Sequence, residues 1–136
     1  MHSAFCIPAN APLSGVYLPQ IEPLTLRFAK LRIVQVIIID EVTMMHKDLL
    51  TVIDNTLRWV RKINEPFGGV LLVIGGDWKQ LLPVVKAPFN CTLYAQLEAC
   101  LQTHSLYDSF QHIVLKENMR AKRDPFFVDF LERVKV

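Results

Sequence analysis

The sequence predicts an α/β domain in which helices flank a mostly parallel sheet. Two short runs rich in β-branched residues, within 33–41 and 70–80, each end in acidic residues. Such runs are typical of parallel strands that helices bury on both faces. Helical patterns alternate with these runs, as in α/β proteins. With 136 residues, 51% of them hydrophobic, the chain has enough material for one domain over 1–136 with its own core.

Three strands and four helices are expected. The strands are predicted at 33–39, 70–74 and 112–115, which is few for such a sheet and indicates part of a larger protein. The helices are predicted at 23–31, 46–63, 93–101 and from 124 onward, where an Asp-Pro pair provides the N-cap and the first turn. The apolar stripe of the second helix consists of Leu49, Ile53, Leu57 and Val60.

Composition narrows the possible function classes. The formal net charge is only +2 and the charges are mixed, so charge alone does not argue for nucleic-acid binding. The three cysteines form no Cys-x-x-Cys pair, and the four histidines do not cluster at metal-ligand spacing. No apolar run is long enough to cross a membrane, so no membrane partner is expected.

Asp40 and Glu41 follow the first apolar run directly. The carboxyl end of a parallel strand faces the crevice where α/β proteins bind ligands. There, one carboxylate can hold Mg²⁺ through its water shell while the other orients an attacking water, as in the Walker-B strand of nucleotide hydrolases. A strand that simply ends in solvated acids is the other interpretation, and on this motif alone both stay open.

Gly75-Gly76-Asp77-Trp78-Lys79-Gln80 follows the second run. Paired glycines allow a sharp turn or a close approach to a ligand, and a glutamine beyond such a strand can sense a terminal phosphate. Alone, the segment is better interpreted as an exposed glycine-rich turn. Because two neighbouring strands both end in acidic loops, the balance moves toward a nucleotide site. Arg120 could stabilise charge on a γ-phosphate or pair with DNA, although its spacing alone favours a surface arginine.

The two tryptophans have different expected roles. Trp59 lies on the predicted helix 46–63 and is expected in the core. Trp78 lies in a loop after a strand, where packing and stacking on a nucleic-acid base are equally good interpretations.

Several segments share their order with the motifs of one family. Residues 2–8 (HSAFCIP) resemble the end of a TAHSAF.IP motif, and 38–44 (IIDEVTM) a Walker-B motif IIDEVSM. Residues 57–69 end in PFGG, 75–84 resemble GGDFRQ.LPV, and 115–127 contain Asn-Met-Arg. Together they resemble the Pif-type (petite integration frequency) ATP-dependent DNA helicases of superfamily one, including the Helitron transposon-encoded branch. Trp78 and Lys79 depart mildly from the family's Phe and Arg, and Lys cannot make the bidentate contacts of Arg.

The resemblance implies a partial RecA-like motor domain of a helicase that uses ATP and Mg²⁺ to translocate and separate DNA strands. Repair, recombination and telomere maintenance are the family's processes. Asp40 would hold Mg²⁺, Glu41 would activate water, and Gln80 and Arg120 would act at the γ-phosphate. The nucleotide-binding residues implied are Asp40, Gly76, Asp77, Gln80 and Arg120. Those implied near single-stranded DNA are His2, Ser3 and Phe5.

No GxxxxGK[ST] phosphate-binding loop occurs in the 136 residues. The resemblance implies that this loop and the first strand precede His2, and that a second motor domain follows Val136. The chain alone is therefore expected neither to hydrolyse ATP nor to unwind DNA. The alternative is a remnant without catalytic activity that binds nucleic acid or protein. A nuclear or mitochondrial location is implied by the family alone.

Overall fold

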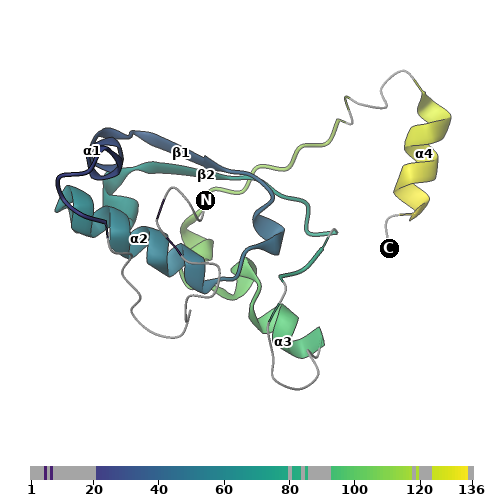
Figure 1. Ribbon diagram of the computed structural model, residues 1–136. Coiled ribbons are helices and arrows are strands. Elements are labelled where there is room, and N and C mark those ends of the chain that lie inside the picture. Colours follow the sequence, from purple (N-terminus) through teal and green to yellow (C-terminus); the bar gives the residue numbers. More distant parts are fainter. Residues whose placement is uncertain are drawn as a thin grey trace.

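The computed structural model describes Phe5, Ile7 and residues 21–79, 81–83, 85, 93–117, 119 and 124–134. Two parallel strands lie along α2, with α1 at one end, while α4 lies apart from these elements (Figure 1). No helix in the described ranges has the length and apolar character needed to cross a membrane. The elements are α1 (Leu26–Ile33), β1 (Val36–Ile39), α2 (Asp48–Arg61), β2 (Leu71–Ile74), α3 (Leu93–Glu98) and α4 (Pro125–Val134).

The sheet consists of β1 and β2, which pair in parallel from Val36 opposite Leu71 to Ile39 opposite Ile74. The predicted parallel arrangement is confirmed, but the prediction that helices bury both faces is wrong. In the described part of the chain α2 covers one face of the sheet. Since side chains alternate along a strand, every second residue of β1 and β2 points to the uncovered face. The exposed residues are Val36, Ile38, Leu71 and Val73.

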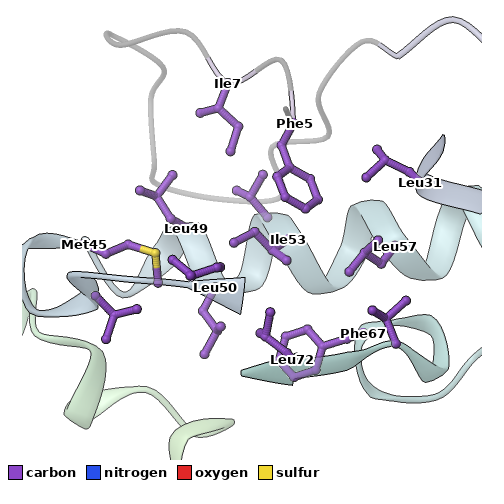
Figure 2. Close-up of a cluster of buried hydrophobic side chains, with 14 of the residues drawn as sticks. Phe5, Ile7, Leu31, Met45, Leu49, Leu50, Ile53, Leu57, Phe67 and Leu72 are labelled. Carbon is purple, nitrogen blue, oxygen red and sulfur yellow. The ribbon is translucent and has the colours of Figure 1, made fainter. Parts of the chain in front are cut away.

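The core is organised around α2. Its predicted stripe is confirmed, since Leu49, Ile53, Leu57 and Val60 are all buried. Figure 2 shows Phe5 and Ile7 on one side of α2, and Leu72 and Phe67 on the other. Asp48 lies in the first turn of α2, and Arg58 and Arg61 in the last, as the helix dipole favours.

The start of the chain's first helix was predicted too early. α1 begins at Leu26 because the Thr25 hydroxyl caps it, accepting from the backbone N–H of Phe28 at 3.3 Å. Leu24 therefore precedes the helix and is fully exposed. The helix continues through Ile33, and for this reason β1 starts at Val36 rather than at the predicted position 33.

The strand predicted at 112–115 is absent from the described part of the chain. Residues 111–117 form an exposed segment without strand pairing, and Ile113, Val114 and Leu115 face solvent. α3 is shorter than the predicted helix 93–101. Its residues Leu93 and Leu97 are exposed, whereas Leu101, in the following 3-10 turn, is buried. The predicted start of α4 is confirmed, because the Asp124 carboxylate accepts from the backbone N–H of Phe127 at 3.0 Å.

Two polar side chains of α2 hold the turn Pro66–Gly69, whose sequence is PFGG. The buried carboxylate of Asp54 accepts from the backbone N–H of Phe67 and from Nε of Arg58. Arg61 donates from Nε to the carbonyl of Gly68 at 2.7 Å. Its Nη1 donates to the carbonyls of Arg32 and Val34, both at 2.8 Å. Arg61 thus connects this turn to the segment that joins α1 to β1.

His104 links α2 to the turns after α3. Its Nδ1 accepts from the backbone N–H of Leu106 at 3.1 Å, so the ring hydrogen lies on Nε2, which donates to the Thr51 hydroxyl at 2.7 Å. Burial lowers the pKa of His104 below its usual 6.5. A proton on Nδ1 would also remove the acceptor that Leu106 uses.

We expect the free energy of unfolding to fall on acidification below about pH 6.5, where the unfolded chain begins to take up protons on histidine. Because the pKa of His104 is lowered in the folded state, its stabilisation is complete above that pH and is lost as the pH falls through the folded-state pKa. Urea unfolding between pH 7.5 and about pH 5 measures this loss. His104→Gln should reduce the pH dependence, whereas the exposed His112→Gln should not. Equal profiles for the wild type and His104→Gln would contradict the prediction.

Candidate functional site

The loops that follow β1 and β2 lie side by side at the carboxyl edge of the sheet. The backbone N–H of Gly75 donates to the carbonyl of Ile39 at 2.9 Å, and the N–H of Val42 donates to the carbonyl of Gly75 at 3.0 Å. These two bonds continue the parallel pairing past the last strand residues. Asp40 and Glu41 are therefore held next to Gly75 and the residues after it, as the sequence predicted.

Asp40 and Glu41 are both exposed and stand at a sharp reversal of the backbone. The Asp40 carboxylate accepts from the backbone N–H of Glu41 at 2.9 Å. Glu41 has left-handed backbone angles (φ 54°, ψ 42°), which cost a non-glycine residue about 1–2 kcal/mol. The 3-10 turn Val42–Met44 follows at once. A strained residue of this kind is typical of functional sites.

Gly76 is needed for the close approach of the two loops. A Cβ on Gly76 would lie 3.1 Å from Cγ2 of Thr43 and 3.2 Å from Cγ2 of Val42. A Cβ on Gly75 would meet only the Asp40 carboxylate, at an ordinary 3.5 Å. The sequence predicted a sharp turn or a close approach to a ligand for the glycine pair, and the structure shows instead a close approach of Gly76 to the loop after β1.

We expect Gly76→Ala to lower the free energy of unfolding by about 1 kcal/mol, because the methyl groups of Thr43 and Val42 and the backbone of Val42 must shift by a few tenths of an ångström to admit the new methyl group. Gly75→Ala is the matched control and should change stability by less than about 1 kcal/mol. Urea unfolding followed by circular dichroism compares the two variants. If both lose the same stability, the contacts around Gly76 are not the cause.

Thr43 lies directly behind the two acids, in the 3-10 turn Val42–Met44. Its side chain is buried, and its hydroxyl has no hydrogen-bond partner in the structure. An unsatisfied buried hydroxyl costs about 1–3 kcal/mol. Thr43 lies in the segment 38–44 that resembles a Walker-B motif, but a threonine two positions after the acids is equally suited to a solvent-exposed turn, so its burial was not predicted.

The remaining predicted residues divide into three groups. Asp77 follows β2 as predicted and accepts from the backbone N–H of Lys79 at 3.1 Å. Phe5 is a core residue that is 3% exposed, so its ring has no surface to offer DNA, and the predicted DNA contact is not supported by its position. The predicted residues that lie outside the described part of the chain are His2, Ser3, Gln80 and Arg120.

The two tryptophans differ in burial and in the residues that they contact. Trp78 is partly buried and packs edge-on against Tyr107, with ring centroids 5.8 Å apart, which favours the packing interpretation. Trp59 is 45% exposed, so its predicted place in the core is wrong. It lies on the side of α2 that faces α1, where Phe28 contacts only part of the ring.

The edge of the sheet suits a hard cation better than a soft one. Among the described residues, no group of three or more His, Cys, Asp or Glu side chains could hold a metal ion. The residues available, Asp40 and Glu41, offer carboxylate oxygens alone. Mg²⁺ is commonly held by one or two carboxylates together with water and substrate phosphates. The donors present therefore fit Mg²⁺ bound with a phosphate ligand.

Parallel strands, a covering helix and acids at the carboxyl ends of neighbouring strands define a partial RecA-like α/β domain. A family model described as PIF1-like helicase matches residues 1–131. The ATP-dependent DNA helicase PIF1 of Emericella nidulans is 33% identical over 102 residues, which are 75% of this chain and 13% of that protein. The chain belongs to the PIF1-like helicase family.

Solved structures agree with this assignment. The crystal structure of Pif1 helicase from Candida albicans is 34% identical, with a TM-score of 0.65, over 80% of this chain and 23% of that chain. Pif1 helicase from Bacteroides, in complex with ADP-AlF3 and ssDNA, is 28% identical, with a TM-score of 0.75, over 98% of this chain and 32% of that chain. The chain thus spans between an eighth and a third of these relatives.

Proposed function

We propose that the chain forms part of the first motor domain of an ATP-dependent DNA helicase. The complete protein would couple ATP hydrolysis to movement along single-stranded DNA and to strand separation. The observation that carries this proposal is the placement of Asp40 and Glu41 beside the loop that begins with Gly75 and Gly76, where β1 and β2 end together. Family membership adds the substrate class, because the relatives are ATP-dependent DNA helicases.

In this proposal the two carboxylates have separate roles. Asp40 directly follows β1 and would help to hold Mg²⁺ through its water shell. Glu41 is turned away from the strand direction by its left-handed backbone and would orient and deprotonate the attacking water. Bound Mg²⁺ would neutralise charge on the phosphates of ATP. Exposure of both acids leaves them accessible to a ligand from outside the chain.

Further roles follow the family resemblance. Gln80 would sense the γ-phosphate, and Arg120 would stabilise charge that develops on it. His2 and Ser3 would lie near single-stranded DNA. The Bacteroides relative was solved with ADP-AlF3 and ssDNA, which supports both ligand classes for the parent of this chain.

A phosphate-binding loop would have to come from a segment outside these residues. Such a loop provides most of the backbone N–H groups that surround the phosphates, and no GxxxxGK[ST] occurs in the 136 residues. We therefore expect the isolated chain to show no ATPase activity above background.

The test uses the longest natural polypeptide that contains this chain. Glu41→Gln should lower its DNA-stimulated ATPase rate by at least about 100-fold, because the general base is lost while the shape is kept. Asp40→Asn should also lower the rate and raise the Mg²⁺ concentration that is needed. Asp129→Asn on α4, an exposed acid away from the strand ends, should leave the rate unchanged.

Two results would contradict the proposal. One is a wild-type rate in the Glu41→Gln polypeptide. The other is an Asp40→Asn polypeptide with the wild-type rate and Mg²⁺ requirement. ATPase activity in the isolated chain that Glu41→Gln removes would contradict only the expectation that a further phosphate-binding segment is needed. Salt-sensitive binding of single-stranded DNA by the chain, in a polypeptide without ATPase activity, would favour the alternative of a binding remnant.

A further inference from the structure

A shallow apolar groove lies between α1 and the last turns of α2, with a volume of about 370 Å³. We call it the Trp59 groove. Its apolar lining comes from Pro23, Leu24, Phe28, Trp59 and Val60. Arg32 and Lys62 complete the lining, and no acidic residue takes part in it.

The aromatic side chains of the groove are held in a fixed arrangement. Phe28 of α1 meets Trp59 of α2 edge-on, with ring centroids 5.7 Å apart and planes at 82°. Trp59 is nevertheless 45% exposed, and Leu24 beside it is fully exposed. Exposed aromatic residues that are already fixed by packing are typical anchors of protein interfaces, because little conformational entropy is lost when a partner covers them.

The two cations of the groove are available to a ligand. Lys62 ends α2 in a left-handed conformation, and Arg32 lies in the last turn of α1. Within the described structure neither side chain forms an ion pair. The other arginines at this end of α2 are occupied, since Arg58 binds Asp54 and Asn64, and Arg61 binds three backbone carbonyls.

We propose that the Trp59 groove docks an acidic peptide segment of a partner protein. One apolar side chain of the peptide would pack against Trp59 and Phe28, and flanking carboxylates would face Arg32 and Lys62. A purely apolar partner would leave the two cations without counter-charges, and a basic one would be repelled by them.

The same observations favour a peptide over nucleic acid. Affinity for nucleic acid grows with the number of phosphates that are neutralised, and the lining offers two cations. The rest of the lining is apolar, which matches the side chain of a peptide rather than a sugar-phosphate backbone.

The groove is also separate from the strand-end acids. Arg32 and Phe28 precede β1, whereas Asp40 and Glu41 follow it, so the two sites lie at opposite ends of the strand. A docked peptide would leave Asp40 and Glu41 exposed. The inference therefore does not depend on the proposed helicase function.

The experiment measures the fluorescence anisotropy of a labelled synthetic peptide with one central Leu-Phe pair flanked by Asp and Glu residues. We expect saturable binding to the purified chain that weakens as salt is added. Trp59→Ala should lower the affinity at least about tenfold, as loss of an aromatic anchor does. The Arg32→Glu, Lys62→Glu double variant should lower it by a similar factor.

Reversing the charges of both the peptide and the groove tests whether charge complementarity causes the binding. A matched peptide with Lys and Arg in place of its acids should not bind the wild-type chain but should bind the double variant. Lys30→Glu, an exposed cation of α1 outside the groove, should change the affinity less than about twofold. Circular dichroism shows whether each variant keeps its helices.

Three outcomes would overturn the proposal. The first is the absence of saturable binding, and the second is equal affinity for the acidic and basic peptides. The third is binding of an oligothymidylate that is lost in Trp59→Ala, which would make the groove a nucleic-acid site.

Discussion

Gly68→Ala should lower the free energy of unfolding by about 3 kcal/mol. Gly68 has a left-handed backbone with φ +58°, where a side chain costs about 1–2 kcal/mol. Its Cβ would also lie 2.7 Å from the carbonyl oxygen of Leu57 and 2.9 Å from the carbonyl carbon. These are backbone atoms of α2 and cannot move like the end of a flexible side chain. Either the turn or the helix must shift, and overpacking of this kind adds about 1–3 kcal/mol.

Gly69→Ala separates these two causes. Gly69 also has a positive φ, +72°, but its Cβ would meet only the Glu65 carboxylate, at 3.5 Å. We therefore expect a loss of about 1 kcal/mol from backbone strain alone. Urea unfolding of both variants measures the difference. Equal losses would show that the close contact with Leu57 does not matter.

Asp54→Ala should cost about 3–5 kcal/mol, because it breaks a largely buried ion pair and leaves its partners uncompensated. Both carboxylate oxygens of Asp54 lie 2.9 Å from Nε of Arg58, and the side chain is 9% exposed. The backbone N–H of Phe67, which is also buried, would lose its acceptor. Thermal and urea unfolding both report the change.

The control is Asp129→Ala on α4. Asp129 pairs with Arg133 four residues later, as Asp54 does with Arg58, but both side chains are mostly exposed. Surface pairs of this spacing contribute about 0.3–0.5 kcal/mol. A loss at Asp54 no larger than that at Asp129 would mean that burial does not strengthen the first pair.

The sequence predicted correctly those elements whose pattern lies within the element itself. The apolar stripe of α2 repeats every three or four residues, so its buried face follows from spacing alone. Asp124-Pro125 marked the start of α4 for the same reason. The neighbouring carboxyl ends of β1 and β2 followed from their parallel pairing, which placed Asp40 and Glu41 beside the glycine pair.

Other features depend on contacts that no local pattern contains. A run such as VIII has the same composition whether helices cover one face of its strand or both, so the exposure of Val36 and Ile38 was not predictable. The apolar residues at 113–115 predicted a strand, yet a strand requires a paired neighbour. Trp59 lies outside the apolar stripe of α2, so its expected burial rested on its size and not on the helical pattern. The left-handed backbone of Glu41 lies in the turn where the loops after β1 and β2 are hydrogen-bonded to each other, and no local pattern indicated it.

The contacts of Arg61 predict how mutant alleles at this position would behave in cells. Arg61 joins three backbone carbonyls from two distant segments and lies at the end of the strands opposite Asp40 and Glu41. Alleles that change it would therefore reduce the amount of folded protein and not the turnover of each surviving molecule. Such alleles should behave as temperature-sensitive and recessive, and they should be suppressed by overexpression. In the helicase proposed above, alleles at Glu41 would instead leave a stable, inactive protein that can still compete with the normal one.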